Sequence, residues 1–209
     1  FSVYRAMIAS VRRTAKLEVL FGIEADYYPG CLEFQRTWLP SQEFDLVLGS
    51  VHYIGDWPFD HPSHQSRWKA CNVEAEWRRY FQLVGELADA AIYDVVAHFD
   101  LPKKFGARPP DDTILEMAAP ALDKVAKAGM GIEINTSGLR KPVREIYPSP
   151  GILKLAYQRN IPISFASDAH TPEDVGADFR AAMDLAKNSG YTQYAQYRAR
   201  AAAFAQIPG

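Results

Sequence analysis

Short runs of Val, Ile and Leu alternate along the chain with longer stretches in which apolar residues recur at helical spacing. Continuous apolar runs of this length are typical of parallel strands that are buried on both faces. Their alternation with helices predicts an α/β fold with a mainly parallel sheet. The predicted strands lie within Leu17–Tyr27, Phe44–Tyr53, Asp94–Asp100, Gly131–Ser137 and Ile163–His170.

The stretches between these runs carry signals for where helices begin and end. Asn72 is placed to cap a helix at its N-terminus, and Gly129 to end one at its C-terminus. The tail from Tyr191 to Gly209 fits either a strand or a short helix. The expected helices cover about Val3–Val11, Val73–Ala91, Asp111–Ala128, a stretch after Ser149-Pro150, and Glu173–Lys187.

Composition limits the class of protein. The chain has 209 residues, which fits one domain with a sizeable core. Lys and Arg number 23 against 25 Asp and Glu, so nothing indicates a basic surface for nucleic acid or an anionic membrane. Cys31 and Cys71 form no C-x-x-C pair, and no apolar run reaches the roughly 18 residues of a membrane span. We therefore expect a single cytoplasmic domain over residues 1–209 that acts on a small molecule.

Metal-capable side chains mark the ends of four predicted strands. Glu24, His52 and His98 each end one strand, and Asp168-Ala169-His170 ends another. The carboxyl edge of a parallel sheet is where active sites form in barrel and open α/β folds. Side chains two residues apart on an extended chain point to the same side, so Asp168 and His170 can share one site.

The type of these side chains indicates a metal centre. A lone histidine at a strand end is more often a hydrogen-bonded structural residue than a ligand. Three histidines and two carboxylates in equivalent places make coincidence a poor explanation. Nitrogen and oxygen ligands without sulfur favour Zn, Mn or Fe(II) over Ca or Mg alone. A carboxylate such as Glu24 can bridge two ions, and paired ions can hold a phosphoryl group and activate water.

A second group of candidates is cationic and follows two of the same strands. Arg140 lies in a loop that is fixed by a neighbouring glycine and proline, and Lys103 and Lys104 follow the His98 strand. Arg and Lys above a metal site can bind phosphate. Surface loops are also commonly rich in Lys and Arg, which is the favoured interpretation for each of the two lysines taken singly. Arg140 is the stronger functional candidate.

A long loop, Gly55–Cys71, follows the second strand and is expected to cover the strand ends. We expect it to lie over the substrate, with Trp57 and Trp68 as apolar walls for an imidazole. His61 and His64 in the same loop are interpreted as surface or lid residues rather than metal ligands.

Five motifs occur in an order that ties these candidates together: Gly22–Tyr27 (GIEADY), Gly49–Tyr53 (GSVHY), Ala97–Leu101 (AHFDL), Glu133–Pro142 (EINTSGLRKP) and Ser167–His170 (SDAH). Together they resemble the histidinol-phosphate phosphatase branch of the PHP (polymerase and histidinol phosphatase) family. The segments Trp57–Asp60 and Glu145–Ser149 are similar to that branch as well. Each motif alone would be weak, whereas the set is specific over about Gly22–Gly176.

The resemblance implies a distorted, TIM-like β/α barrel of seven strands with two to three divalent ions, either Zn, Mn or Fe. The family also has a His-x-His pair near its N-terminus, then an Asp and another His, and none of these precedes Glu24 here. We therefore expect an α/β barrel that lacks its first strands and is incomplete on that side. The implied metal ligands are Glu24, His52, His98, Asp168 and His170.

The implied reaction is hydrolysis of L-histidinol phosphate to L-histidinol and phosphate, a step of histidine biosynthesis. Arg140, Lys103 and Lys104 would bind the phosphate, and Asp168 or His170 would give a proton to the leaving alkoxide, with no choice between the two. Two alternatives stay open: a PHP phosphoesterase that acts on a nucleotide or sugar phosphate, and a non-catalytic scaffold with this fold. The sequence does not predict an oligomeric state.

Overall fold

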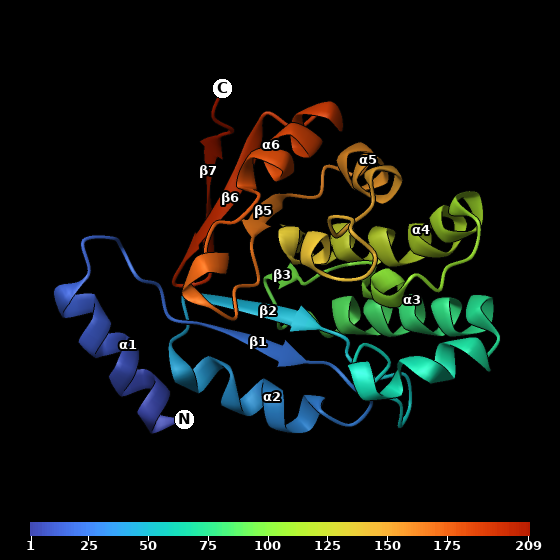
Figure 1. Ribbon diagram of the computed structural model, residues 1–209. Coiled ribbons are helices and arrows are strands. Elements are labelled where there is room, and N and C mark those ends of the chain that lie inside the picture. The colour runs from blue at the N-terminus through green and yellow to red at the C-terminus, as the bar shows by residue number, and fades with distance from the viewer.

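The computed structural model describes residues 1–209 and contains a five-stranded parallel sheet in the order β1-β2-β3-β4-β5 (Figure 1). Each strand pairs with the next strand along the chain, so that Glu24 on the first lies opposite Leu48 on the second. This arrangement confirms the predicted α/β class. The strands are β1 (Gly22–Asp26), β2 (Leu46–Ser50), β3 (Val95–Val96), β4 (Gly131–Asn135) and β5 (Ile163–Ala166).

The hydrogen-bonded sheet is open, because β1 and β5 are its two outer strands and no strand joins them. The tail, for which strand and helix were both possible, forms an antiparallel pair. Ala195 and Tyr197 of this pair pack against Val95, which places the pair against the parallel sheet. The pair consists of β6 (Gln193–Arg198) and β7 (Ala201–Gln206).

Helices follow the strands and cover the sheet (Figure 1). Asn72 caps α3 as predicted, since its side chain accepts a hydrogen bond from the backbone N–H of Ala75 at 3.1 Å. Gly129 follows the end of α4 with φ 69°, a conformation that favours glycine. The α-helices are α1 (Ser2–Thr14), α2 (Leu32–Trp38), α3 (Val73–Ala90), α4 (Asp111–Lys127), α5 (Pro150–Gln158) and α6 (Phe179–Asn188).

Several connections are short 3-10 helices, and one of them changes a predicted boundary. The helix expected from Glu173 starts only at Phe179, because a 3-10 turn and the left-handed residues Gly176 and Asp178 intervene. None of the helices is long and apolar enough to cross a membrane. The 3-10 helices are η1 (Pro40–Gln42), η2 (Pro62–Lys69), η3 (Leu101–Phe105), η4 (Thr136–Arg140) and η5 (Pro172–Asp174).

The long loop after β2 is anchored by its aromatic residues. Trp57 and Trp68 are 1% and 4% exposed, and their ring centroids lie 4.6 Å apart. The Trp68 indole N–H donates to the carbonyl oxygen of Phe59 at 2.9 Å. Both rings therefore belong to the hydrophobic core and do not form the substrate wall that the sequence suggested. Burying two indole rings stabilises the fold more than exposing them in a cleft would. His61 and His64 are exposed, as expected.

Candidate metal and phosphate site

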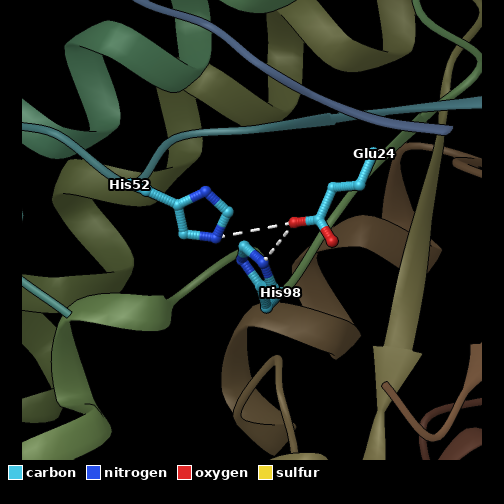
Figure 2. Close-up of side chains that lie close together, drawn as sticks. All are labelled: Glu24, His52 and His98. Atoms are coloured by element: carbon cyan, nitrogen blue, oxygen red, sulfur yellow. Dashed lines mark hydrogen bonds and ion pairs between the residues drawn. The ribbon is translucent and has the colours of Figure 1, made fainter. Parts of the chain in front are cut away.

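Three of the predicted ligands converge at the carboxyl edge of the sheet. Glu24 is the third residue of β1, and His52 and His98 follow the last residues of β2 and β3 by two positions each. Glu24 Oε1 lies 3.0 Å from His98 Nε2 and 3.5 Å from His52 Nε2 (Figure 2). One ligand atom from each of the three residues lies within 4.8 Å of the other two. The two imidazoles and the carboxylate thus point their donor atoms at one common point.

Neighbouring carboxylates hold the two histidines. Asp26 Oδ1 contacts His52 Nδ1, which leaves Nε2 of that ring directed at Glu24. The backbone N–H of His98 donates to Glu133 Oε1 at 2.8 Å, and the same oxygen accepts from Asn135 Nδ2 at 2.7 Å. A carboxylate on the second ring nitrogen orients a histidine ligand in metal sites and sets its tautomer, which is the role of Asp26 toward His52, whereas Glu133 holds the backbone of His98.

The electrostatic coupling between Glu24 and His98 is strong. Burial alone would raise the pKa of Glu24, but the hydrogen bond and the charge of His98, together with His52, lower it to about 2. Burial alone would lower the pKa of His98, whereas Glu24 and the nearby Glu133 raise it to about 9. The carboxylate of Glu24 is therefore held in its charged, ligand-competent form.

Two of the predicted ligands have left-handed backbones although neither is glycine. His98 has φ 26° and Asp168 has φ 47°. Non-glycine residues in such conformations cost of order 1–3 kcal/mol and cluster at functional sites. The surrounding structure therefore holds both side chains in place at the expense of backbone strain.

Asp168 and His170 line the same cavity. Ser137 Oγ donates to Asp168 Oδ2 at 3.0 Å, which ties the segment after β5 to the turn after β4. His170 Nδ1 lies 3.0 Å from the carbonyl oxygen of Asp168, and 76% of its side chain is exposed. The structure thus brings all five predicted ligands to one cavity, with three of them in direct mutual contact.

The cavity has a volume of about 210 Å³. Lys104 lies in its wall and its Nζ is 2.9 Å from Asp60 Oδ2. Lys141 lies in the wall as well, one residue after the predicted Arg140. The lining residues are Glu24, His52, Asp60, His98, Leu101, Lys104, Ser137, Lys141, Tyr147, Asp168 and His170.

Two of the three predicted phosphate ligands lie outside this lining. Arg140 donates from Nη2 to the carbonyl oxygen of Ser167 and pairs through Nε with Asp174 at 3.1 Å. Lys103 is fully buried, with its Nζ 3.0 Å from Asp100 Oδ2. Arg140 braces the segment that carries Asp168, and Lys103 lies behind the wall of the cavity.

Sequence reasoning missed five polar residues of the site: Asp26, Asp60, Ser137, Lys141 and Tyr147. Asp26 and Lys141 lie next to predicted residues in quoted motifs, so proximity to a strand end could have found them. Asp60 and Tyr147 lie in the two further segments that resemble the family, but in loops whose paths the sequence does not give. Gly138 explains part of that path, because a Cβ atom there would clash with the carbonyl oxygen of Glu145 and lie 2.8 Å from Tyr147 Cε2.

The donor set fits a divalent metal ion. Two Nε2 atoms and a charged carboxylate oxygen converge, and Asp26 holds one ring by its other nitrogen. Mixed nitrogen and oxygen ligands of this kind suit Zn²⁺ and other transition metals.

A parallel sheet covered by helices, with imidazole and carboxylate groups gathered at its carboxyl edge, defines a β/α protein with a candidate metal site at that edge. The sequence matches the PHP domain family over residues 4–137, and the chain belongs to this family. The probable histidinol-phosphatase of Deinococcus radiodurans is 39% identical over 189 residues, which cover 90% of this chain and 72% of that protein. The histidinol-phosphatase of Bacillus subtilis is 29% identical, over 81% of this chain and 69% of its own length.

Solved structures share the fold. A histidinol phosphate phosphatase from Lactococcus lactis, in complex with zinc, L-histidinol and phosphate, superposes with a TM-score of 0.81 at 17% identity, over 97% of this chain and 79% of that one. A putative histidinol phosphatase from Listeria monocytogenes gives a TM-score of 0.72 at 22% identity, over 86% and 75% of the two chains. The family that the motifs indicated is confirmed by the domain match and by the 39% identical relative.

Proposed function

We propose that this protein is a metal-dependent phosphatase that hydrolyses L-histidinol phosphate to L-histidinol and phosphate. The observation that carries the proposal is the convergence of Glu24, His52 and His98 at the carboxyl edge of the sheet, in a chain that is 39% identical to a probable histidinol-phosphatase. The Lactococcus lactis neighbour, which binds zinc, L-histidinol and phosphate, has the same fold. Hydrolysis of this ester would place the protein in histidine biosynthesis.

We propose that Glu24, His52, His98, Asp168 and His170 hold two to three divalent ions, with zinc the first candidate. Divalent ions, when bound there, supply Lewis-acid chemistry, since they polarise phosphoryl oxygens and acidify water. The chain's own contribution is to keep Glu24 charged and to direct both Nε2 atoms inward. Asp26 holds the ring of His52 in that orientation, and Glu133 holds the backbone of His98.

Lys104 and Lys141 are the cations placed to contact the phosphate, because both line the cavity that contains the ligand cluster. Asp60 holds the ammonium group of Lys104 in that wall. Arg140 and Lys103 act from behind the wall. Arg140 steadies Ser167, the residue before Asp168, and contact between its guanidinium and the phosphate stays a prediction.

Hydrolysis forms a bond from a water oxygen to phosphorus and breaks the bond from phosphorus to the ester oxygen. The leaving alkoxide must gain a proton. Asp168 and His170 both line the cavity, so either can supply that proton. Lys104 and Lys141 offset the charge that remains on the phosphoryl oxygens.

Steady-state kinetics on a panel of phosphomonoesters tests the substrate. L-histidinol phosphate should be preferred over nucleotide and sugar phosphates by at least about tenfold in kcat/KM, or about 1.4 kcal/mol. Equal rates across the panel would refute the substrate assignment and favour a general phosphoesterase.

Elemental analysis of the purified protein tests the metal centre independently of turnover. We expect two to three divalent ions per chain, with zinc present, and loss of activity on chelation that added zinc restores. A folded protein without bound metal would instead support a non-catalytic scaffold.

A further inference from the structure

The hydroxyl group of Tyr147 is buried at the candidate site without a hydrogen-bond partner. Tyr147 is 1% exposed and lines the same cavity as Glu24, His98 and Asp168. Its oxygen is one of only five buried side-chain nitrogen or oxygen atoms in the protein that lack a partner. Buried polar groups are almost always hydrogen-bonded, so such an exception in a cavity wall requires an explanation.

The ring of Tyr147 is fixed from both sides. Its backbone N–H donates to the carbonyl oxygen of Asn135 at 3.0 Å, and its carbonyl oxygen accepts from the Asn135 N–H at 2.7 Å. The ring meets the imidazole of His98 edge to face, with centroids 6.4 Å apart. Lys103 Nζ lies 5.2 Å from the centre of the ring. These contacts hold the backbone at Tyr147 and pack its buried ring.

The buried pair of Lys103 and Asp100, with the partly exposed Glu145, lies next to the ring. Lys103 Nζ donates to the carbonyl oxygen of Ile146 at 2.7 Å and lies 3.0 Å from Asp100 Oδ2 and 3.3 Å from Glu145 Oε2. Asp100 Oδ2 also accepts from the backbone N–H of Ser149 at 2.9 Å. These contacts hold the residues on either side of Tyr147. The buried Lys103 therefore helps to fix the position of this side chain, despite the cost of burying its charge.

We propose that the Tyr147 hydroxyl donates a hydrogen bond to a phosphoryl oxygen of the bound phosphomonoester. The inference rests on the proposed function, since it assigns a further contact in the same cavity. A phosphate that reaches from the cluster around His98 to Lys104 and Lys141 passes the wall that Tyr147 forms. A tyrosine hydroxyl carries its proton at neutral pH and is a donor of the kind that phosphate oxygens accept.

Tyr147→Phe separates this role from a structural one. If the hydroxyl has no partner in the free protein, its removal should leave the thermal unfolding midpoint unchanged or raise it, because no folded-state hydrogen bond is lost. The same change should lower kcat/KM for L-histidinol phosphate by about 10- to 100-fold, as expected for a lost hydrogen bond to a charged group. It should also weaken binding of inorganic phosphate to the metal-loaded protein, measured by calorimetry.

Tyr191→Phe is the matched control. Tyr191 is also buried, but its hydroxyl donates to the carbonyl oxygen of Ile161 at 3.0 Å, and it does not line the cavity. Its loss should lower the unfolding midpoint and leave both kcat/KM and phosphate affinity unchanged. The two variants should therefore show opposite patterns of stability and binding.

Phosphate affinity decides the inference even if the substrate is different. If wild-type protein binds inorganic phosphate but does not hydrolyse L-histidinol phosphate, the proposed substrate is wrong, and weaker phosphate binding by Tyr147→Phe still supports the contact. If Tyr147→Phe binds phosphate as tightly as wild type, with the same metal content, the inference is overturned.

Discussion

Carboxylates stand at both ends of the parallel sheet, but their surroundings differ. At the amino end, Asp45 precedes β2 and Asp94 precedes β3. Asp45 accepts from the backbone N–H groups of Phe21 and Ala199, at 2.8 and 3.1 Å. Asp94 accepts from the Val47 N–H at 2.8 Å and from Arg200 at 2.9 to 3.1 Å. Every one of these oxygens has a partner within the fold.

At the carboxyl end, Glu24 contacts one nitrogen of His52 and one of His98. The buried Nδ1 of His98 and the Tyr147 hydroxyl have no hydrogen-bond partner. His98 and Asp168 also hold strained backbone conformations. The same residue types thus stabilise the fold where partners saturate them and remain available for a ligand where they do not. Substitutions at the amino end should reduce stability, and substitutions at the carboxyl end should reduce activity.

Glu24→Gln should have the largest effect. A neutral amide is a poor metal ligand, so bound metal and activity should fall together. Loss of a residue that only contacts a metal ligand costs up to about 100-fold, so loss of a ligand itself should reduce kcat/KM by at least about 100-fold. Elemental analysis and kinetics on the same preparation provide the test, with Glu116→Gln on the exposed face of α4 as control. Retention of both metal and activity would remove Glu24 from the site.

Arg200→Leu, at the amino end of the sheet, should lower the stability of the protein without changing its activity. It removes the partner of Asp94, whose side chain is 10% exposed, while that of Arg200 is 30% exposed. Loss of a fully buried pair costs about 3–5 kcal/mol, so partial exposure suggests about 2–3 kcal/mol. Urea unfolding measures this loss, and kcat/KM below the transition should match wild type. Arg198→Leu, which removes an exposed pair with Glu18, should cost under about 1 kcal/mol.

Arg140→Ala tests whether Arg140 contacts the substrate or only stabilises the structure around the site. If the guanidinium only steadies the segment of Asp168, kcat should fall about tenfold through misplacement, while inhibition by inorganic phosphate stays unchanged. A higher inhibition constant for phosphate would show that Arg140 contacts the substrate, as the sequence suggested. Lys at this position should rescue only in part, because it lacks the planar fork.

Lys141→Met should have the smallest effect of the four. Its ammonium is placed to contact phosphate at the rim of the cavity, where water screens the charge. We expect KM to rise about fivefold, or about 1 kcal/mol, with kcat little changed. Lys154→Met on α5, which faces solvent, is the control, and equal KM values in the two variants would contradict the assignment.

The sequence predicted the sheet well because buried parallel strands leave continuous apolar runs. It predicted the tail less well, since β7 consists largely of alanine and carries no β-branched signal. The short α2 went unnoticed because seven residues give too few helical repeats. The helix that begins at Phe179 was placed too early, because a left-handed turn delays it.

The site was predictable where function follows strand ends. His52 and His98 lie two residues beyond such ends, and Glu24 lies two residues before one, inside β1 rather than at its end as predicted, so the topology brings the three together. Lys103 lay beyond such reasoning, because lysine is almost never fully buried unless it is paired, and its partners Asp100 and Glu145 meet it only after folding. Contacts between loops decide such positions, and no local pattern records them.

Gly138 shows what a close contact between backbones means for the tolerance of the chain to mutation. No other residue fits beside the carbonyl oxygen of Glu145 and the Tyr147 ring without moving both. A methyl group at position 138 would therefore push on Tyr147 and, through Glu145, on Lys103. In a library of single substitutions, position 138 should accept glycine alone, although its own atoms take no part in binding or chemistry. Gly138 thus restricts the sequence of this loop, although its only contribution is the space that it leaves free for Glu145 and Tyr147.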